Sequence, residues 1–342
     1  MFWRRTGWDA SYHFKHFRDF LQLPHVLNGL GDAIVVILLS YLWLREPKRD
    51  RPQLKIIFYG ILVFVFAVGF DQWYHEKFGI DLTTWSPSHF MMYAGTMIAL
   101  LGSFLYVFRD YRHGRISLKT KRVFGLVFSY LALDGFWFPM LQHEQGVVMD
   151  YSLKHGIRLA DPDLLDLFFR TQHSIYSNLP GWLYGAWAVL CAVLVFQFVK
   201  RMQLHRFGAT IVAGLYLAER VVMNAIFTLT NYPLSALPYY LILVAFVFDV
   251  AHDSLKERPV ARDFLTSIVP IAGIVALGFV NFETPIHPPI PVLQTFVYSI
   301  PAAALGYAGS ILVYRFLFYP QTLSARPIGG LSGRRRKAYS FS

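Results

Sequence analysis

Apolar residues recur along the chain in nine runs of about 20 residues, separated by short polar connections. A run of this length can cross the hydrocarbon core of a bilayer as an α-helix, which satisfies its own backbone hydrogen bonds there. The pattern therefore predicts an all-α fold, a polytopic transmembrane helix bundle with about nine spans. The predicted spans are residues 24–44, 54–74, 87–108, 123–143, 181–201, 207–230, 235–252, 264–282 and 291–317.

Lysine and arginine are concentrated in every second connection. Cytoplasmic loops of membrane proteins carry an excess of these residues, so the basic connections are predicted to face the cytoplasm. The basic segments are 45–55, 109–122, 200–206, 256–262 and the tail, whereas 71–86, 144–180, 231–234 and 283–290 are poorer in lysine and arginine. This alternation predicts one integral membrane domain over residues 1–342, located in a bacterial cytoplasmic membrane.

The ends of the chain and its longest connection complete this topology. Residues 1–23 contain basic residues but no uninterrupted apolar stretch, which predicts an interfacial N-terminal segment rather than a removable signal peptide. Residues 144–180 are predicted to form an outer loop, and residues 318–342 a basic cytoplasmic tail.

Composition narrows the classes of function. With 55% hydrophobic and 15% charged residues, the chain is too apolar for an ordinary soluble domain, and the lipid bilayer is its first partner. The net charge of +11 lies mainly in the connections, so it reports topology and no nucleic-acid partner is expected. The single cysteine, Cys191, excludes an intrachain disulfide and a cysteine-based metal site.

The segment GFDQWYHEKFGIDLTTWSPSHF, residues 69–90, places polar residues where one apolar run ends and the next begins. Asp71 and His75 are four residues apart and share a face if the second helix extends that far. Ser86 followed by Pro87 is a helix-start signal, which puts His89 in the first turn of the third helix. The short loop between the helices lets His89 face the edge that carries Asp71 and His75.

Two imidazoles and a carboxylate at adjoining helix ends form a three-ligand site with open positions. Such a donor set suits a divalent transition metal such as copper, iron or zinc, and the spacing does not choose among them. The alternative is that Asp71 caps its helix or pairs with Lys77, while His75 and His89 are solvated residues at the membrane surface.

This segment resembles the C subunit of the copper membrane monooxygenases, the particulate methane and ammonia monooxygenase family. The similarity covers mainly residues 71–95: Asp71-x3-His75, then Ser86-Pro87-Ser88-His89, then an apolar helix containing Tyr93-Ala94-Gly95. The resemblance implies that Asp71, His75 and His89 hold a copper ion. The second ligand set of that family follows an Asn-x3-His pattern, which the fourth span does not contain.

Other polar residues interrupt the apolar runs, and each is costly inside a bilayer. Asp134, His143 and His173 are candidates for a second metal set or a proton relay; bonding of Asp134 to a neighbouring Ser, Tyr or Trp is the alternative. Glu219 and Arg220 are adjacent and point in different directions, so separate partners in a structural polar network are expected; a substrate or proton path is the alternative. Asp249, His252 and Asp253 are attributed to helix capping and interfacial pairing.

Three functions are compatible with these patterns. The leading hypothesis is a membrane metalloprotein with an Asp/His/His copper site near the outer face, a copper-dependent monooxygenase or monooxygenase-like subunit that oxidises an apolar small molecule or a lipid. Companion membrane subunits or a homo-oligomer are its expected partners. The alternatives are a copper-binding or copper-transport protein without catalysis, and a zinc-dependent membrane hydrolase that uses the same three ligands.

Overall fold

The computed structural model describes residues 23–46, 51–78, 86–154, 180–230, 237–281 and 291–318. Every secondary-structure element within these residues is an α-helix, which confirms the all-α fold. Each predicted span corresponds to one helix. In chain order the helices are α2 (Leu23–Arg45), α3 (Pro52–Phe78), α4 (Pro87–Arg112), α5 (Leu118–Lys154), α7 (Trp182–Arg201), α8 (Gly208–Thr230), α9 (Tyr239–Ser254), α10 (Pro259–Asn281) and α11 (Val292–Phe318).

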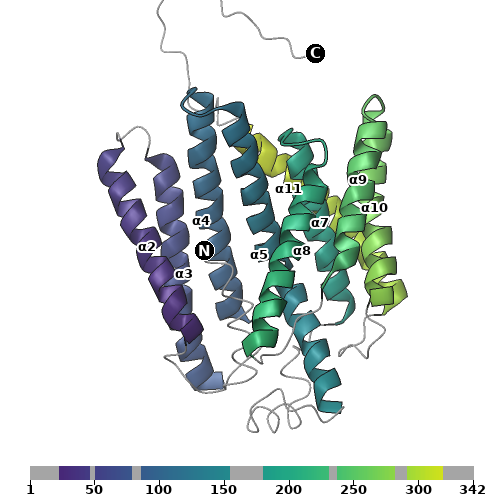
Figure 1. The fold of residues 1–342 in the computed structure, drawn as a ribbon, viewed down its shortest axis with the longest axis horizontal. Coiled ribbons are helices and arrows are strands. Elements are labelled where there is room, and N and C mark those ends of the chain that lie inside the picture. The colour runs from purple at the N-terminus through teal and green to yellow at the C-terminus, as the bar shows by residue number, and fades with distance from the viewer. Residues whose placement is uncertain are drawn as a thin grey trace, which may run out of the picture.

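The helices lie side by side and successive helices run in opposite directions (Figure 1). The helix ends that border the four predicted cytoplasmic connections all lie at the upper end of the bundle in this view. The end of α3 and the start of α4 lie at the lower end. The alternation of charge along the sequence therefore matches the alternation of helix direction.

Six of the described helices are long and apolar enough to cross a membrane. They are the helices or helix segments Pro52–Tyr74, Pro87–Arg112, Trp182–Arg201, Gly208–Thr230, Pro259–Ala276 and Val292–Phe316. The short helix α9 has 16 residues and is about 24 Å long, less than the thickness of a hydrocarbon core. Membrane crossing is thus supported for six helices, while the crossings by α2, α5 and α9 stay predictions.

Helix α7 is the centre of the bundle. It contacts α5, α8, α10 and α11, and most of its side chains are buried, including Val189, Ala192 and Phe196. By contrast, α2 and α3 present large apolar side chains to the surroundings: Ile37 is 66% exposed, Leu44 83% and Phe66 62%. Such broad apolar exposure is stable in lipid but not in water, so the surface agrees with an integral membrane protein.

A polar cluster joins α7, α8 and α9 at the upper end of the bundle. Asp249 is fully buried and accepts hydrogen bonds from the backbone N–H of Ala209 and of Thr210, which caps the start of α8. The Lys200 ammonium lies 3.1 Å from Asp249 Oδ1 and donates to Asp253 Oδ1 at 2.9 Å. Capping and ion pairing therefore account for Asp249 and Asp253, as predicted.

Asp253 also shows how this end of the bundle balances charge. Burial opposes ionisation of its carboxyl group, but the hydrogen bond and positive charge of Lys200, together with the neighbouring His252, hold its pKa below the ordinary value. Asp253 accepts hydrogen bonds from both Lys200 and the exposed Arg206. The Arg206 Nε atom lies 3.2 Å from Asp253 Oδ2. The cluster ties the ends of three helices together.

Several predicted segments lie wholly or mostly outside the described residues. They are the N-terminal segment 1–22, the loop residues 79–85, residues 155–179, the predicted connections 231–234 and 283–290, and the tail from residue 319. The predicted outer loop 144–180 begins differently from expectation, because α5 continues as helix to Lys154. The sequence of residues 144–154 allows this continuation, because it contains no proline and only one glycine, Gly146.

Candidate functional site

Close packing of α3 against α4 positions the candidate metal ligands. At Gly95, a Cβ atom would lie 2.6 Å from the Phe64 backbone N, and at Gly102 it would lie 2.7 Å from the Ile57 backbone N. A Cβ on Gly60 would also collide with the backbone of Ala99. Only glycine allows backbones to approach this closely, as in other membrane helix pairs with small residues at the interface. The two helices are therefore held together along their length.

The start of α4 follows the predicted signal. Ser86 is the N-cap residue with extended backbone (φ −62°, ψ 151°), and its Oγ accepts a hydrogen bond from the His89 backbone N–H at 3.4 Å. Pro87 occupies the start of the helix, where its missing N–H carries no cost. Ser86 and Ser88 are both buried, which anchors this turn. The helix-start prediction and the place of His89 in the first turn are confirmed.

Asp71, about two turns before the end of α3, lies close to His89 in the first turn of α4. The Asp71 Oδ1 atom lies 3.4 Å from His89 Nε2, and the two side chains are 19% and 21% exposed. The fold therefore brings together two of the three predicted ligands, which are 18 positions apart in the sequence.

His75 lies within α3, one helical turn after Asp71, but its side chain is outside the described part of the structure. Among the described side chains, no group of three His, Cys, Asp or Glu residues is arranged to hold a metal. The described part of the candidate site is thus a carboxylate and one imidazole. The participation of His75 stays a prediction.

Aromatic residues flank both members of this polar pair in the sequence. Phe70 stacks on Trp73 with ring centroids 5.5 Å apart and contacts the Tyr74 ring at 6.2 Å. Trp73 is 47% exposed, and Phe90, next to His89, is 55% exposed. The helix ends therefore combine an apolar surface with a carboxylate and an imidazole.

The arrangement fits a transition metal by the chemistry of its donors. Imidazole nitrogen and carboxylate oxygen bind copper, zinc and iron, and the contact between Asp71 and His89 needs only a small rearrangement to enclose an ion. Without an ion, the same contact is an Asp–His interaction that orients the ring.

Asp134 belongs to a different polar cluster, between α5 and α8. Its carboxylate is buried and forms an ion pair with the guanidinium of Arg220, which is also buried. Tyr130, one turn earlier on α5, donates to Glu219 Oε2 at 2.6 Å. Glu219 and Arg220 therefore have separate partners, as predicted.

The partner of Asp134 is an arginine rather than the Ser, Tyr or Trp considered from sequence. Arg220 supplies its counter-charge, so Asp134 is not included among the metal ligands proposed below. The His143 side chain and His173 lie outside the described residues. A second metal set is consequently left as a prediction for these two histidines alone.

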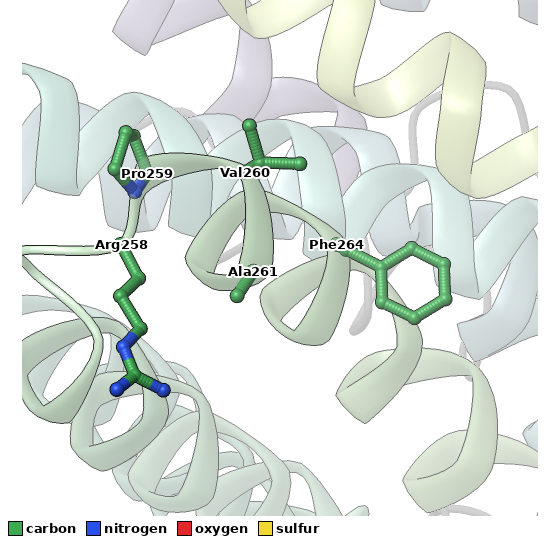
Figure 2. Close-up of a pocket in the computed structure, with 5 residues that line it drawn as sticks. All are labelled: Arg258, Pro259, Val260, Ala261 and Phe264. Atoms are coloured by element: carbon green, nitrogen blue, oxygen red, sulfur yellow. The ribbon is translucent and has the colours of Figure 1, made fainter.

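A shallow hollow at the start of α10 offers no comparable chemistry. It is lined by Arg258, Pro259, Val260, Ala261 and Phe264. Figure 2 shows the side chains of Arg258, Val260 and Phe264 pointing in different directions, so polar groups do not converge there. The hollow also lies at the end of the bundle opposite Asp71 and His89 (Figure 1).

Two features of the site were missed from sequence. One is the glycine contact between α3 and α4, which the small residues Gly95, Ala99 and Gly102 signal by their helical spacing. The other is the ion pair of Asp134 with Arg220, for which opposite charges in two apolar spans are the available signal.

The chain was also compared with known proteins. No family model, no curated protein and no solved structure matches it.

Proposed function

We propose that this protein is a membrane metalloprotein in which Asp71, His75 and His89 hold a copper ion at the adjoining ends of α3 and α4. The observation that carries the proposal is the contact between Asp71 Oδ1 and His89 Nε2 across two helices locked together by glycines. His75 is one turn from Asp71, on the same face of α3. The three donors leave coordination positions open for a further ligand.

Copper is preferred to zinc or iron because of the resemblance of residues 71–95 to the copper membrane monooxygenase C subunit. A copper ion bound there would supply one-electron redox chemistry toward dioxygen. In this proposal His75 and His89 are the nitrogen donors, and Asp71 is the anionic donor that offsets part of the metal charge. The packing of α3 on α4 fixes the separation of the donors.

The proposed substrate class is an apolar small molecule or a lipid. Phe70 and Phe90 are the sequence neighbours of Asp71 and His89, and the apolar side chains of Trp73 and Phe90 are exposed. A molecule dissolved in the bilayer can therefore reach the helix ends without crossing a polar layer. The reaction proposed is its copper-dependent oxidation, in a monooxygenase-like subunit that faces the outer side of a cytoplasmic membrane.

Copper binding to the purified protein tests this proposal. The unsubstituted protein is expected to retain about one copper ion per chain, and Asp71→Ala, His75→Ala and His89→Ala are each expected to weaken binding by about tenfold or more. The measurement is metal content after dialysis against a weak chelator. Parallel loading with zinc and iron shows which metal the site retains.

His113→Ala is the matched control. His113 caps the opposite end of α4, where its Nδ1 lies 2.8 Å from the Arg109 carbonyl oxygen, and it is exposed. Copper content is expected to be unchanged in this variant. Equal copper content in all four variants, or retention of zinc with loss of copper, would contradict the proposal.

A further inference from the structure

The connection between α4 and α5 is strongly basic. Residues 109–122 contain six lysine or arginine residues and one aspartate, Asp110. Asp110 Oδ1 lies 2.9 Å from the guanidinium of Arg109 and 3.1 Å from that of Arg115. Glu46, just after α2, lies 3.8 Å from Arg109 as well. These two carboxylates offset only part of the positive charge, so the segment keeps an excess of cations.

A tight turn fixes the end of α4 relative to the start of α5. Gly114 has a φ of 69°, a left-handed conformation that glycine adopts without strain. The backbone N–H of Arg115 donates to the Asp110 carbonyl oxygen at 2.9 Å. Ser117 Oγ accepts from the Thr120 backbone N–H at 3.1 Å, which caps the start of α5. The two helix ends therefore lie side by side at the upper end of the bundle (Figure 1).

Two cations from these helix ends converge on one buried aromatic ring. The centroid of the Phe108 ring lies 5.0 Å from the guanidinium carbon of Arg112 and 5.5 Å from Lys121 Nζ. Lys121 Nζ also lies 4.9 Å from the centroid of the Tyr111 ring. The rings attract each cation, but the two positive charges repel each other. The arrangement therefore favours an anion that contacts both cations.

Lys121 is partly removed from water, whereas Arg112 is accessible. The Lys121 side chain is half-buried, and its Nζ donates to the Met202 carbonyl oxygen, just after α7, at 3.5 Å. Burial lowers the pKa of the Lys121 ammonium group below its ordinary value, and the charge of the neighbouring Arg122 adds to this effect. A bound anion offsets both effects. Arg112 is exposed, so a ligand from the surroundings can reach its guanidinium.

Apolar side chains are exposed next to these cations. Leu118, Val123 and Phe124 lie on the first turns of α5, and all three are exposed. Phe124 follows Lys121 by three positions and therefore lies on the same side of α5. A ligand that carries both a phosphate group and an acyl chain complements this surface, whereas a free anion complements the cations alone.

We propose that Arg112 and Lys121 bind the phosphate group of an anionic phospholipid, whose acyl chains lie along the exposed apolar residues at the start of α5. The guanidinium donates hydrogen bonds to phosphate oxygen atoms, and the ammonium contributes a compact positive charge. Basic pockets between helices at the cytoplasmic side of membrane proteins bind anionic headgroups in this way. The site lies at the end of α4 opposite to His89, so it is independent of the proposed copper site.

Lipid binding to the purified, full-length protein tests this site. The delipidated protein in detergent is titrated with phosphatidylglycerol or with phosphatidylcholine of the same acyl chains, and native mass spectrometry counts the bound lipid molecules. We expect phosphatidylglycerol to bind more tightly. Arg112→Gln and Lys121→Gln are each expected to weaken its binding by about fivefold, and the double change by about 25-fold. Lys121→Arg keeps the charge and is expected to retain binding.

Lys119→Gln is the matched control for the loss of one charge. Lys119 is exposed on the same turn of α5 but lies two positions from Lys121, on a different side of the helix. Phosphatidylglycerol binding is expected to be nearly unchanged in this variant. An equal loss in Lys119→Gln and Lys121→Gln would indicate a general attraction to positive charge and would overturn the proposal. Equal binding of the two lipids, or displacement of phosphatidylglycerol by an equal concentration of inorganic phosphate, would overturn it as well.

Discussion

Replacing Arg220 by methionine is expected to lower the free energy of unfolding by about 3 to 5 kcal/mol. Arg220 and Asp134 are buried partners that link α8 to α5 near the middle of the bundle. Removal of the guanidinium leaves the Asp134 carboxylate without its counter-charge, and the cost of a buried, uncompensated charge is far larger than the net value of the pair. Thermal or denaturant-induced unfolding in detergent measures the loss.

Two comparisons make this prediction specific. The double change Asp134→Asn with Arg220→Met removes both charges and is expected to recover most of the lost stability. Arg115→Met, which breaks the exposed pair with Asp110, is expected to cost no more than about 1 kcal/mol. If Arg220→Met were as mild as Arg115→Met, the ion pair would not hold α5 to α8.

Replacing Gly95 by alanine is expected to destabilise the bundle by about 1 to 3 kcal/mol and to weaken copper binding. The added methyl group would lie 2.6 Å from the Phe64 backbone N and 2.8 Å from the Gly60 carbonyl oxygen. Backbone atoms cannot turn aside as a side chain can, so α3 and α4 must separate. Because the 3.4 Å contact between Asp71 of α3 and His89 of α4 joins these two helices, it is lost with the packing.

Gly69→Ala is the matched control on α3. A Cβ at Gly69 meets no atom within 4 Å, so the substitution only replaces a weak helix former by the best one. It is expected to leave stability unchanged or to raise it by up to about 1 kcal/mol, with copper binding unaffected. The same substitution should therefore have opposite signs at two positions, and equal effects at Gly69 and Gly95 would contradict the close contact.

The helices were predictable because each apolar run is long and is bordered by polar residues. The alternation of basic connections predicted the direction of every helix, since charge placement follows topology rather than local structure. The apolar runs do not determine the exact length of each helix. Helix α9 has only 16 residues, although its apolar run predicted a full membrane span. The packing of α3 on α4 was also not predictable, because its glycine contacts depend on which faces of the two helices meet.

The candidate site was predictable where a local signal fixes the backbone. Ser86 and Pro87 start α4 and thereby place His89, and the spacing of Asp71 and His75 follows from the helical repeat. The partner of Asp134 was not predictable from sequence, because Arg220 is 86 residues away in the chain. Any polar residue of a neighbouring helix could equally have paired with Asp134. Long-range pairing of charges requires the packing of α5 on α8.

Electron paramagnetic resonance of the copper(II)-loaded protein tests the central claim most directly, because it detects the nitrogen atoms bound to the metal. We expect coupling to two histidine nitrogens in the unsubstituted protein, loss of one of them in His75→Ala and in His89→Ala, and an unchanged spectrum in His113→Ala. A spectrum unaffected by both His75→Ala and His89→Ala would show that copper binds elsewhere and would contradict the proposed site.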